Sequence, residues 1–307
     1  MMTRAYLFPG QGSQEPGMGQ DLYQTHPEAR AIMDQAESLV PGLLEACFSD
    51  DDTVLNQTEI VQPAIVTVSA ALWELLPQDL REGYVTGHSL GEYSALYAAG
   101  FLSFADTLRL VKERARLMGE AAREVSGGMM AVMGVEYAEL VRLIQEWDLT
   151  EEVFPANRNS AQQTVISGTE KGLEFFGGKA KEKGLKAVRL KVTGPFHSPL
   201  MEPVAEAFRS SLSEFTFQEP ALPLVSATTA QVVKDPAELK EILVKQFTSP
   251  VLWTDTVSWL VQSGVQTVVE VGPGKVLTGL IRRIDRSLGR VNIQTAADIA
   301  AWAEKNG

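Results

Sequence analysis

The sequence predicts an α/β protein with a mostly parallel sheet and a smaller inserted domain. Three observations predict this class. Hydrophobic residues make up 45% of the 307 residues and charged residues 21%, which is the balance of a packed globular protein. Short apolar runs alternate with amphipathic segments, as they do where helices connect parallel strands. In the middle of the chain the expected order is β-α-β-β-α-β, which is typical of a ferredoxin-like unit.

Residues 1–126 are expected to form the first part of a large domain. In chain order, this part should hold a strand over 5–8, a helix over 63–76, a strand over 84–86, and helices over 90–99 and 103–122. Pro63 should lie in the first turn of its helix, where a missing N–H costs nothing. Ser103 and Asp106 form a capping-box-like start for the last of these helices.

Residues 127–193 are expected to fold as a small domain inserted into the large one. Its expected elements are strands over 129–135, 153–157, 164–167 and 186–192 and helices over 137–147 and 170–183. Glycines at 127–128 and at Gly194 would serve as hinges beside a cleft. Residues 194–307 then complete the large domain. Their expected elements are a helix over 201–215, a strand over 224–226, helices over 236–247 and 251–262, a strand over 267–271, and a helix over 276–288.

The charge balance limits the partners that the protein can have. Asp and Glu outnumber Lys and Arg by 39 to 27, and the net charge of −12 argues against nucleic acid or an anionic membrane. Two stretches are nevertheless basic. Residues 179–191 hold six basic residues against one acidic, and residues 275–290 hold five against one. Each stretch is either a solvated face or a binding site for an acidic partner.

Cysteine content and hydropathy indicate the compartment. The one cysteine, Cys47, cannot form an internal disulfide, which fits a reducing environment. No stretch approaches the ~18 apolar residues of a membrane span, and the first residues lack the pattern of a signal peptide. We therefore expect a cytoplasmic protein.

Residues 87–91 read Gly-His-Ser-Leu-Gly and stand between an expected strand and an expected helix. This G-x-S-x-G pattern in that context describes a nucleophile elbow, a sharp turn that exposes a serine hydroxyl. It predicts Ser89 as a nucleophile. The alternative is a plain glycine-lined turn, because so short a pattern also arises by chance.

A serine nucleophile needs a base, and the chain has three histidines. His26 precedes a proline at a helix start and is expected to be a surface capping residue. His88 is adjacent to the serine, and strand alternation should point its side chain away from the site. His197 follows the small domain in a loop stiffened by two prolines, so elimination predicts His197 as the base.

The glycine loop after the first strand, residues 9–12, would leave backbone N–H groups free to stabilise a developing oxyanion. The N–H of Leu90, directly after the serine, would be a second donor. A phosphate-binding loop is the competing interpretation, but its sequence patterns are absent. Neither paired carboxylates nor Cys/His spacing indicates glycoside chemistry, and no metal site is expected.

Five short motifs follow one another along the whole chain. They lie at residues 8–13, 62–64, 87–93, 194–197 and 270–275. In this order they resemble the malonyl-CoA:acyl-carrier-protein transacylases of bacterial fatty acid synthesis. The resemblance implies an α/β-hydrolase-like core with a ferredoxin-like insertion, in agreement with the pattern of strands and helices.

The resemblance also implies roles for individual residues. It makes Ser89 the acyl-accepting nucleophile and His197 its base, and it places the oxyanion hole at the backbone amides of Gln11 and Leu90. It makes Arg114 the partner of the free malonyl carboxylate. The sequence alone leaves Arg114 as one of several charges on an amphipathic helix, where a solvated face is the default.

Two further positions matter for this resemblance. Gln246 matches a position whose main-chain carbonyl orients the histidine in place of an aspartate. At residues 157–161 the family usually has a proline after its Asn-Ser pair, and here that residue is Ala161. The conformation of this loop, near the mouth of the cleft, is therefore left open.

The implied reaction is ping-pong transfer of a malonyl group. Ser89 attacks the thioester of malonyl-CoA as His197 takes its proton, CoA leaves, and the phosphopantetheine thiol of an acyl carrier protein takes the acyl group from the serine. Malonyl-CoA and the carrier protein are the implied partners. No bound cofactor is needed, and we expect a monomer.

Three alternatives stay open. A stand-alone acyltransferase for a polyketide synthase would carry the same residues. A serine esterase or thioesterase would share Ser89 and His197, but a buried arginine facing the acyl chain does not suit an apolar acyl group. A non-catalytic module would bind a carrier protein without forming an acyl-enzyme. Within the transacylase reading, Phe196 beside the histidine should crowd an α-methyl group such as that of methylmalonyl.

Overall fold

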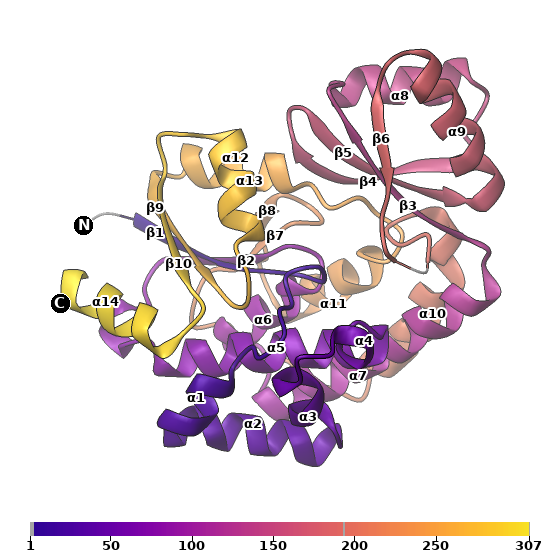
Figure 1. The fold of residues 1–307 in the computed structure, drawn as a ribbon. Coiled ribbons are helices and arrows are strands. Elements are labelled where there is room, and N and C mark those ends of the chain that lie inside the picture. Colours follow the sequence, from indigo (N-terminus) through magenta and orange to yellow (C-terminus); the bar gives the residue numbers. More distant parts are fainter. Residues whose placement is uncertain (1–2, 193, 307) are drawn as a thin grey trace.

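A computed structural model describes residues 3–192 and 194–306 (Figure 1). A four-stranded parallel sheet forms the centre of its larger part. The strand order is β10 (Gly289–Ile293), β9 (Val265–Val271), β1 (Thr3–Phe8) and β2 (Tyr84–Gly87). Along β1, Tyr6 and Phe8 join the core on one face, while Ala5 and Leu7 join the core on the other. Residues 5–8 of this central strand are therefore all apolar, as expected for a segment covered on both faces.

Helices cover both faces of this sheet (Figure 1). On the face of Ala5 lie α12 (Trp253–Gln262) and α13 (Val276–Ile284). On the opposite face, α5 (Thr58–Leu75), α6 (Gly91–Ala98) and α14 (Ala296–Asn306) contact the sheet. The other helices of this side pack on these helices or on one another, and they are α1 (Gln20–Thr25), α2 (Pro27–Leu39), α3 (Leu43–Phe48), α4 (Asp52–Leu55), α7 (Phe104–Glu124), α10 (Glu202–Leu212) and α11 (Pro236–Lys245). Two-residue strands β7 (Val225–Ser226) and β8 (Gln231–Val232) form a hairpin beside β2, and short 3-10 turns lie at Gln78–Leu80 and Pro199–Met201.

The middle of the chain forms a separate antiparallel sheet with its own apolar core. Its strands are β3 (Gly127–Met133), β4 (Val153–Ser160), β5 (Gln163–Thr169) and β6 (Lys186–Arg189), and its helices are α8 (Tyr137–Glu146) and α9 (Glu170–Glu182). The sheet order β4-β5-β3-β6 and the chain order β-α-β-β-α-β together define the ferredoxin-like arrangement. The predicted fold class is confirmed.

Two local expectations are wrong. Helix α5 begins at Thr58, so Pro63 lies inside the helix rather than in its first turn. The helix loses one backbone hydrogen bond there, and burial of nearly its whole length compensates. Gly127 and Gly128 do not form a hinge, because they pair with β5 as the first residues of β3. A Cβ on Gly127 would lie 2.5 Å from the Gly168 carbonyl oxygen, which explains the glycine.

The domain limits at 126/127 and 193/194 stay a prediction, and residues 1, 2, 193 and 307 lie outside the described residues. Within the described ranges, no helix is both long enough and apolar enough to cross a membrane.

Candidate active site

Ser89 occupies a sharp turn between β2 and α6, with a positive φ of 52°. The two glycines of the motif make this turn possible. A Cβ on Gly91 would lie 1.9 Å from the carbonyl oxygen of Phe8, and a Cβ on Gly87 would lie 2.0 Å from the carbonyl carbon of Gly91. Strands β1 and β2 therefore approach helix α6 closely only because Gly91 and Gly87 lack side chains, and the turn presents the serine hydroxyl outward.

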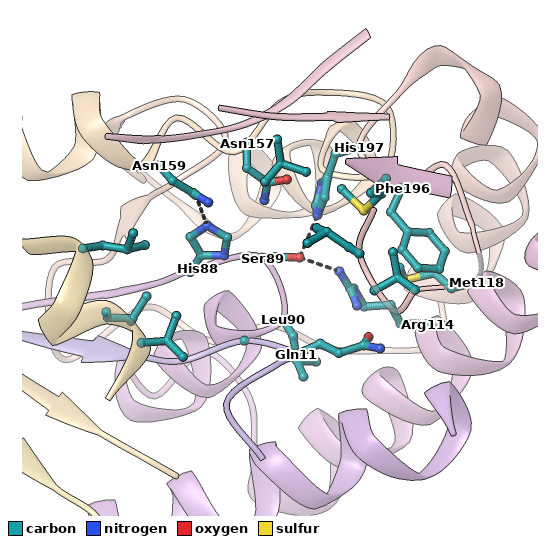
Figure 2. Close-up of a pocket in the computed structure, with 18 residues that line it drawn as sticks. Gln11, His88, Ser89, Leu90, Arg114, Met118, Asn157, Asn159, Phe196 and His197 are labelled. Carbon is teal, nitrogen blue, oxygen red and sulfur yellow. Dashed lines mark hydrogen bonds between the residues drawn. The ribbon is translucent and has the colours of Figure 1, made fainter. Parts of the chain in front are cut away.

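His197 faces this hydroxyl from the loop that follows the small sheet (Figure 2). Its Nε2 lies 2.7 Å from Ser89 Oγ, and its Nδ1 lies 2.8 Å from the main-chain oxygen of Gln246. A carbonyl oxygen only accepts, so Nδ1 carries the proton and Nε2 is free to accept one from the serine. The loop is fixed by two hydroxyls: Ser198 donates to the Pro195 carbonyl at 2.5 Å, and Ser167 donates to the Phe196 carbonyl.

The surroundings of His197 favour its neutral form. Burial is the larger cause and the positive charge of Arg114 the second, and together they lower the pKa of His197 to about 3. At neutral pH the imidazole is therefore uncharged, which is the state that can accept a proton.

The pKa of His197 gives a direct prediction. Because its pKa lies well below the ordinary histidine value of about 6.5, its ring should stay neutral as the pH falls from 7.5 to about 5. Ring-nitrogen chemical shifts in an NMR pH titration measure this, with the His197→Gln variant assigning the signal. A midpoint at pH 6 or above for this ring would contradict the prediction.

Arg114 projects from α7 into the same site and is only 2% exposed. Its Nη1 donates to Gln62 Oε1 at 2.6 Å, and its Nη2 donates to Gln246 Oε1 at 3.1 Å and to Ser89 Oγ at 3.3 Å. The guanidinium also lies over the Tyr93 ring, 5.2 Å from its centre. Within the described residues no carboxylate forms an ion pair with it. A buried cation thus lies beside the serine without a direct anionic partner.

These side chains lie around a cavity of about 180 Å³ (Figure 2). The loop after β1 and the start of α6 form its floor, where Gln11 and Leu90 both line it. A Cβ on Gly10 would lie 2.4 Å from the His88 carbonyl oxygen and 3.7 Å from the Leu90 nitrogen, so the loop and the turn lie against each other. Neither the Gln11 N–H nor the Leu90 N–H has an acceptor in the described part of the chain. Both are available to a ligand.

The remaining walls of the cavity are mostly apolar and come from both parts of the molecule. They are formed by Met118, Met129, Val165, Leu190, Val192, Phe196, Val276, Leu277 and Leu280. A polar centre surrounded by apolar walls strengthens electrostatic interactions inside the cavity.

A comparison with models of protein families identifies the family of this chain. The chain matches the acyl transferase domain over residues 5–304. It belongs to this family. The resemblance inferred from the five motifs is confirmed.

Relatives of this acyl transferase carry a more specific name. The chain is 41% identical over 299 residues to the malonyl CoA-acyl carrier protein transacylase of Bacillus subtilis (strain 168), covering 95% of this chain and 94% of the relative. It is 38% identical over 309 residues to the protein of that name from Staphylococcus aureus (strain MRSA252), covering all of both. A malonyl-transacylase solved in complex with its type II PKS acyl-carrier protein is 34% identical, with a TM-score of 0.94 over 99% of this chain and 100% of that one.

One histidine differs from its expected placement in this acyl transferase. His88 lines the cavity instead of pointing away, because strand β2 ends at Gly87 and strand alternation no longer applies. Its Nε2 lies 2.9 Å from Asn159 Oδ1 and not against the serine. His26 occupies the N-cap position of α2, as expected, although among the described residues its ring makes no capping hydrogen bond and contacts the Thr25 hydroxyl at 2.7 Å.

The loop containing Ala161 has a simple conformation. Strand β4 continues to Ser160, which pairs with Gln163 of β5, so Ala161 and Gln162 form a two-residue turn. Asn157 and Asn159 precede this turn and line the cavity.

The motif at 270–275 holds in place a helix that lines the cavity. The buried carboxylate of Glu270 accepts the backbone N–H groups of Leu277 at 2.9 Å and Thr278 at 2.7 Å, at the start of α13. A carboxylate at this end of a helix is electrostatically favourable. It fixes the helix whose Leu277 and Leu280 line the cavity.

Sequence reasoning gave no role to Gln62 or Glu92. Both side chains are fully buried. Gln62 accepts a hydrogen bond from Arg114, and Glu92 accepts one from the Gln246 side chain. A polar residue inside an apolar helix run was the available signal, because Gln62 lies within the buried stretch of α5.

Proposed function

We propose that this protein transfers malonyl groups from malonyl-CoA to the phosphopantetheine thiol of an acyl carrier protein, in fatty acid biosynthesis. One observation carries the proposal: His197 Nε2 and Arg114 Nη2 converge on Ser89 Oγ, at 2.7 and 3.3 Å. A nucleophile with its base indicates acyl transfer, and a buried cation beside them suits an acyl group that ends in a carboxylate. The names of the relatives agree with this function.

The reaction would proceed in two matched halves. Neutral His197 takes the proton of Ser89, the serine oxygen attacks the thioester carbon, and the free N–H groups of Gln11 and Leu90 stabilise the resulting oxyanion. The tetrahedral intermediate collapses to malonyl-serine, and CoA leaves as a thiol after His197 returns the proton. The phosphopantetheine thiol then attacks malonyl-serine by the reverse path.

A transfer assay separates this function from a serine thioesterase. With malonyl-CoA and a phosphopantetheine-loaded carrier protein, the expected product is malonyl-carrier protein, formed without net release of malonate. Release of malonate at the rate of CoA release, with no acyl-carrier product, would overturn transfer in favour of hydrolysis.

The basic segment at 275–290 is our candidate for the carrier-protein surface. Its helix α13 also lines the cavity, and Arg282, Arg283 and Arg286 are exposed on that segment. Acyl carrier proteins are acidic and this protein carries −12, so attraction has to be local.

Reversing Arg282, Arg283 and Arg286 to Glu should slow transfer to the carrier protein while malonylation by malonyl-CoA keeps its rate. The part of this effect that comes from long-range electrostatic attraction should fade at 1 M salt, where the screening length is about 3 Å. The matched control is charge reversal of Lys181, Lys183 and Lys186, which lie exposed in the part of the chain that forms the antiparallel sheet β4-β5-β3-β6 and its helices. An equal loss in both half-reactions would contradict docking at this segment.

A polyketide carrier protein is the second candidate acceptor, because one structural relative was solved with a type II PKS acyl-carrier protein. Second-half-reaction rates with the two kinds of carrier protein distinguish these acceptors. A cytoplasmic location, a monomeric state and the lack of a bound cofactor remain part of the proposal.

A further inference from the structure

Glu92 is a buried carboxyl group that the transfer reaction above does not use. It follows Gly91 in the first turn of α6, and its side chain has no contact with solvent. Burial raises the pKa of Glu92 to about 7, although the hydroxyl and amide groups around it favour the charged form. A carboxyl group is costly to bury, so the contacts that hold it there are informative.

The contacts of Glu92 lead to the Gln246 side chain. Gln246 Nε2 donates to Glu92 Oε2 at 2.6 Å and to the main-chain oxygen of Ser89 at 3.1 Å. Gln246 Oε1 accepts from Arg114 Nη2 at 3.1 Å. A flipped amide would bring its oxygen against a carboxylate and its N–H groups against a guanidinium. The contacts therefore permit one orientation, and Glu92 is the strongest acceptor that enforces it.

The backbone of Gln246 extends this connection to the base, because its carbonyl oxygen accepts from His197 Nδ1 at 2.8 Å. One residue thus contacts the serine turn, the imidazole and the guanidinium. The Gln246 amide also separates the Glu92 carboxylate from Arg114. Glu92 therefore holds the Gln246 side chain without occupying the guanidinium edge that faces Ser89.

We propose that Glu92 is a positioning residue for acyl transfer, acting through the Gln246 side chain on Ser89, His197 and Arg114. The proposal rests on the transfer function above and adds a residue that never touches the substrate. Its expected size follows from geometry, because a misplacement of about 1 Å at reacting groups costs about 10²-fold in rate.

Two variants distinguish the effect of the length of the Glu92 side chain from the effect of its charge. Glu92→Asp keeps the charge, but its side chain is shorter by one C–C bond of about 1.5 Å, so it no longer reaches Gln246 Nε2. Glu92→Gln keeps an acceptor oxygen at full reach without the charge. We expect single-turnover formation of malonyl-serine to fall about 10–100-fold in the Asp variant and to stay within about threefold of wild type in the Gln variant.

The Gln246→Leu background tests the route of the effect. It keeps the main-chain carbonyl and removes the amide, so adding Glu92→Asp should change the rate by less than about twofold. The rate of malonyl-serine formation is measured by intact mass spectrometry and divided by the fraction of protein that can be malonylated. Tm is measured by circular dichroism. If Glu92→Asp does not fold, Gln246→Leu carries the test alone, and a wild-type rate in that variant overturns the proposal.

Several results would overturn the proposal. These are a wild-type rate with a lowered Tm in Glu92→Asp, a slow Gln variant beside a fast Asp variant, or an undiminished Asp effect in the Gln246→Leu background. Failure of the wild-type protein to form malonyl-serine would instead refute the proposed function itself.

Discussion

Replacing Ser89 with alanine is expected to lower malonyl transfer by about 10⁶-fold and to abolish the acyl-enzyme. The Ser89 hydroxyl is the group that faces His197 Nε2 and Arg114 together, and alanine leaves no nucleophile at that point. Loss of the nucleophile alone costs about as much as loss of nucleophile and base together, because the two act as a unit. Turnover with malonyl-CoA and carrier protein measures the effect.

Ser94→Ala is the matched control, since Ser94 lies on the same helix α6 and its buried hydroxyl has no hydrogen-bond partner among the residues that the structure describes. It should retain wild-type turnover. A Ser89→Ala variant that still accumulates a malonyl adduct at the wild-type rate would refute the assignment of the nucleophile.

Arg114→Ala is expected to cost malonyl transfer about 10²–10⁴-fold and to leave acetyl transfer unchanged or faster. Malonyl-CoA and acetyl-CoA present the same thioester and differ by one carboxylate, which the buried guanidinium can bind through two parallel hydrogen bonds. Acetyl leaves that cation without a partner, so removing the cation does not harm acetyl transfer. The measurement is kcat/KM for both substrates, with folding checked by circular dichroism.

Two further variants sharpen this test. Arg114→Lys should recover part of the loss, because a point charge cannot reproduce the planar fork. Arg116→Ala is the control: Arg116 lies two residues away on α7, half exposed, and pairs with Glu113 and Glu120 on the solvent side. A malonyl-to-acetyl ratio within about threefold of wild type in Arg114→Ala would assign carboxylate recognition to another residue.

The serine turn could be predicted from sequence because its constraints are local. Gly87 and Gly91 are required by contacts of less than 2.5 Å that any Cβ would make with neighbouring backbone. Such constraints appear in the sequence as a fixed pattern between a strand and a helix. The strand and helix order of the middle unit was equally readable, because its apolar residues change period from strand to helix.

The burial of Arg114 was harder to predict from the sequence, although a signal was present. Arg114 lies three residues after Val111 and four before Met118, both buried, so it falls on the apolar stripe of α7. A charge on that stripe is a better candidate for a site than one on the polar face. Charge counting along the helix did not distinguish the two faces.

Other parts of the site leave no trace in a single sequence. The His197 contact with Gln246 uses a main-chain oxygen, which any residue could supply. His88 and Asn159 are 71 positions apart and meet only once the middle unit lies against the parallel sheet. Helices α3 and α4 span six and four residues, which is too short for a periodic pattern.

The central claim is that Ser89 carries the malonyl group between two thiols. Brief exposure of the wild-type protein to malonyl-CoA, followed by intact mass and peptide mapping, tests it most directly. One malonyl group per chain, located on Ser89 and discharged on addition of a phosphopantetheine-loaded carrier protein, is the result that the account predicts. An unmodified chain, or a malonyl group on a different residue with Ser89 free, would contradict it.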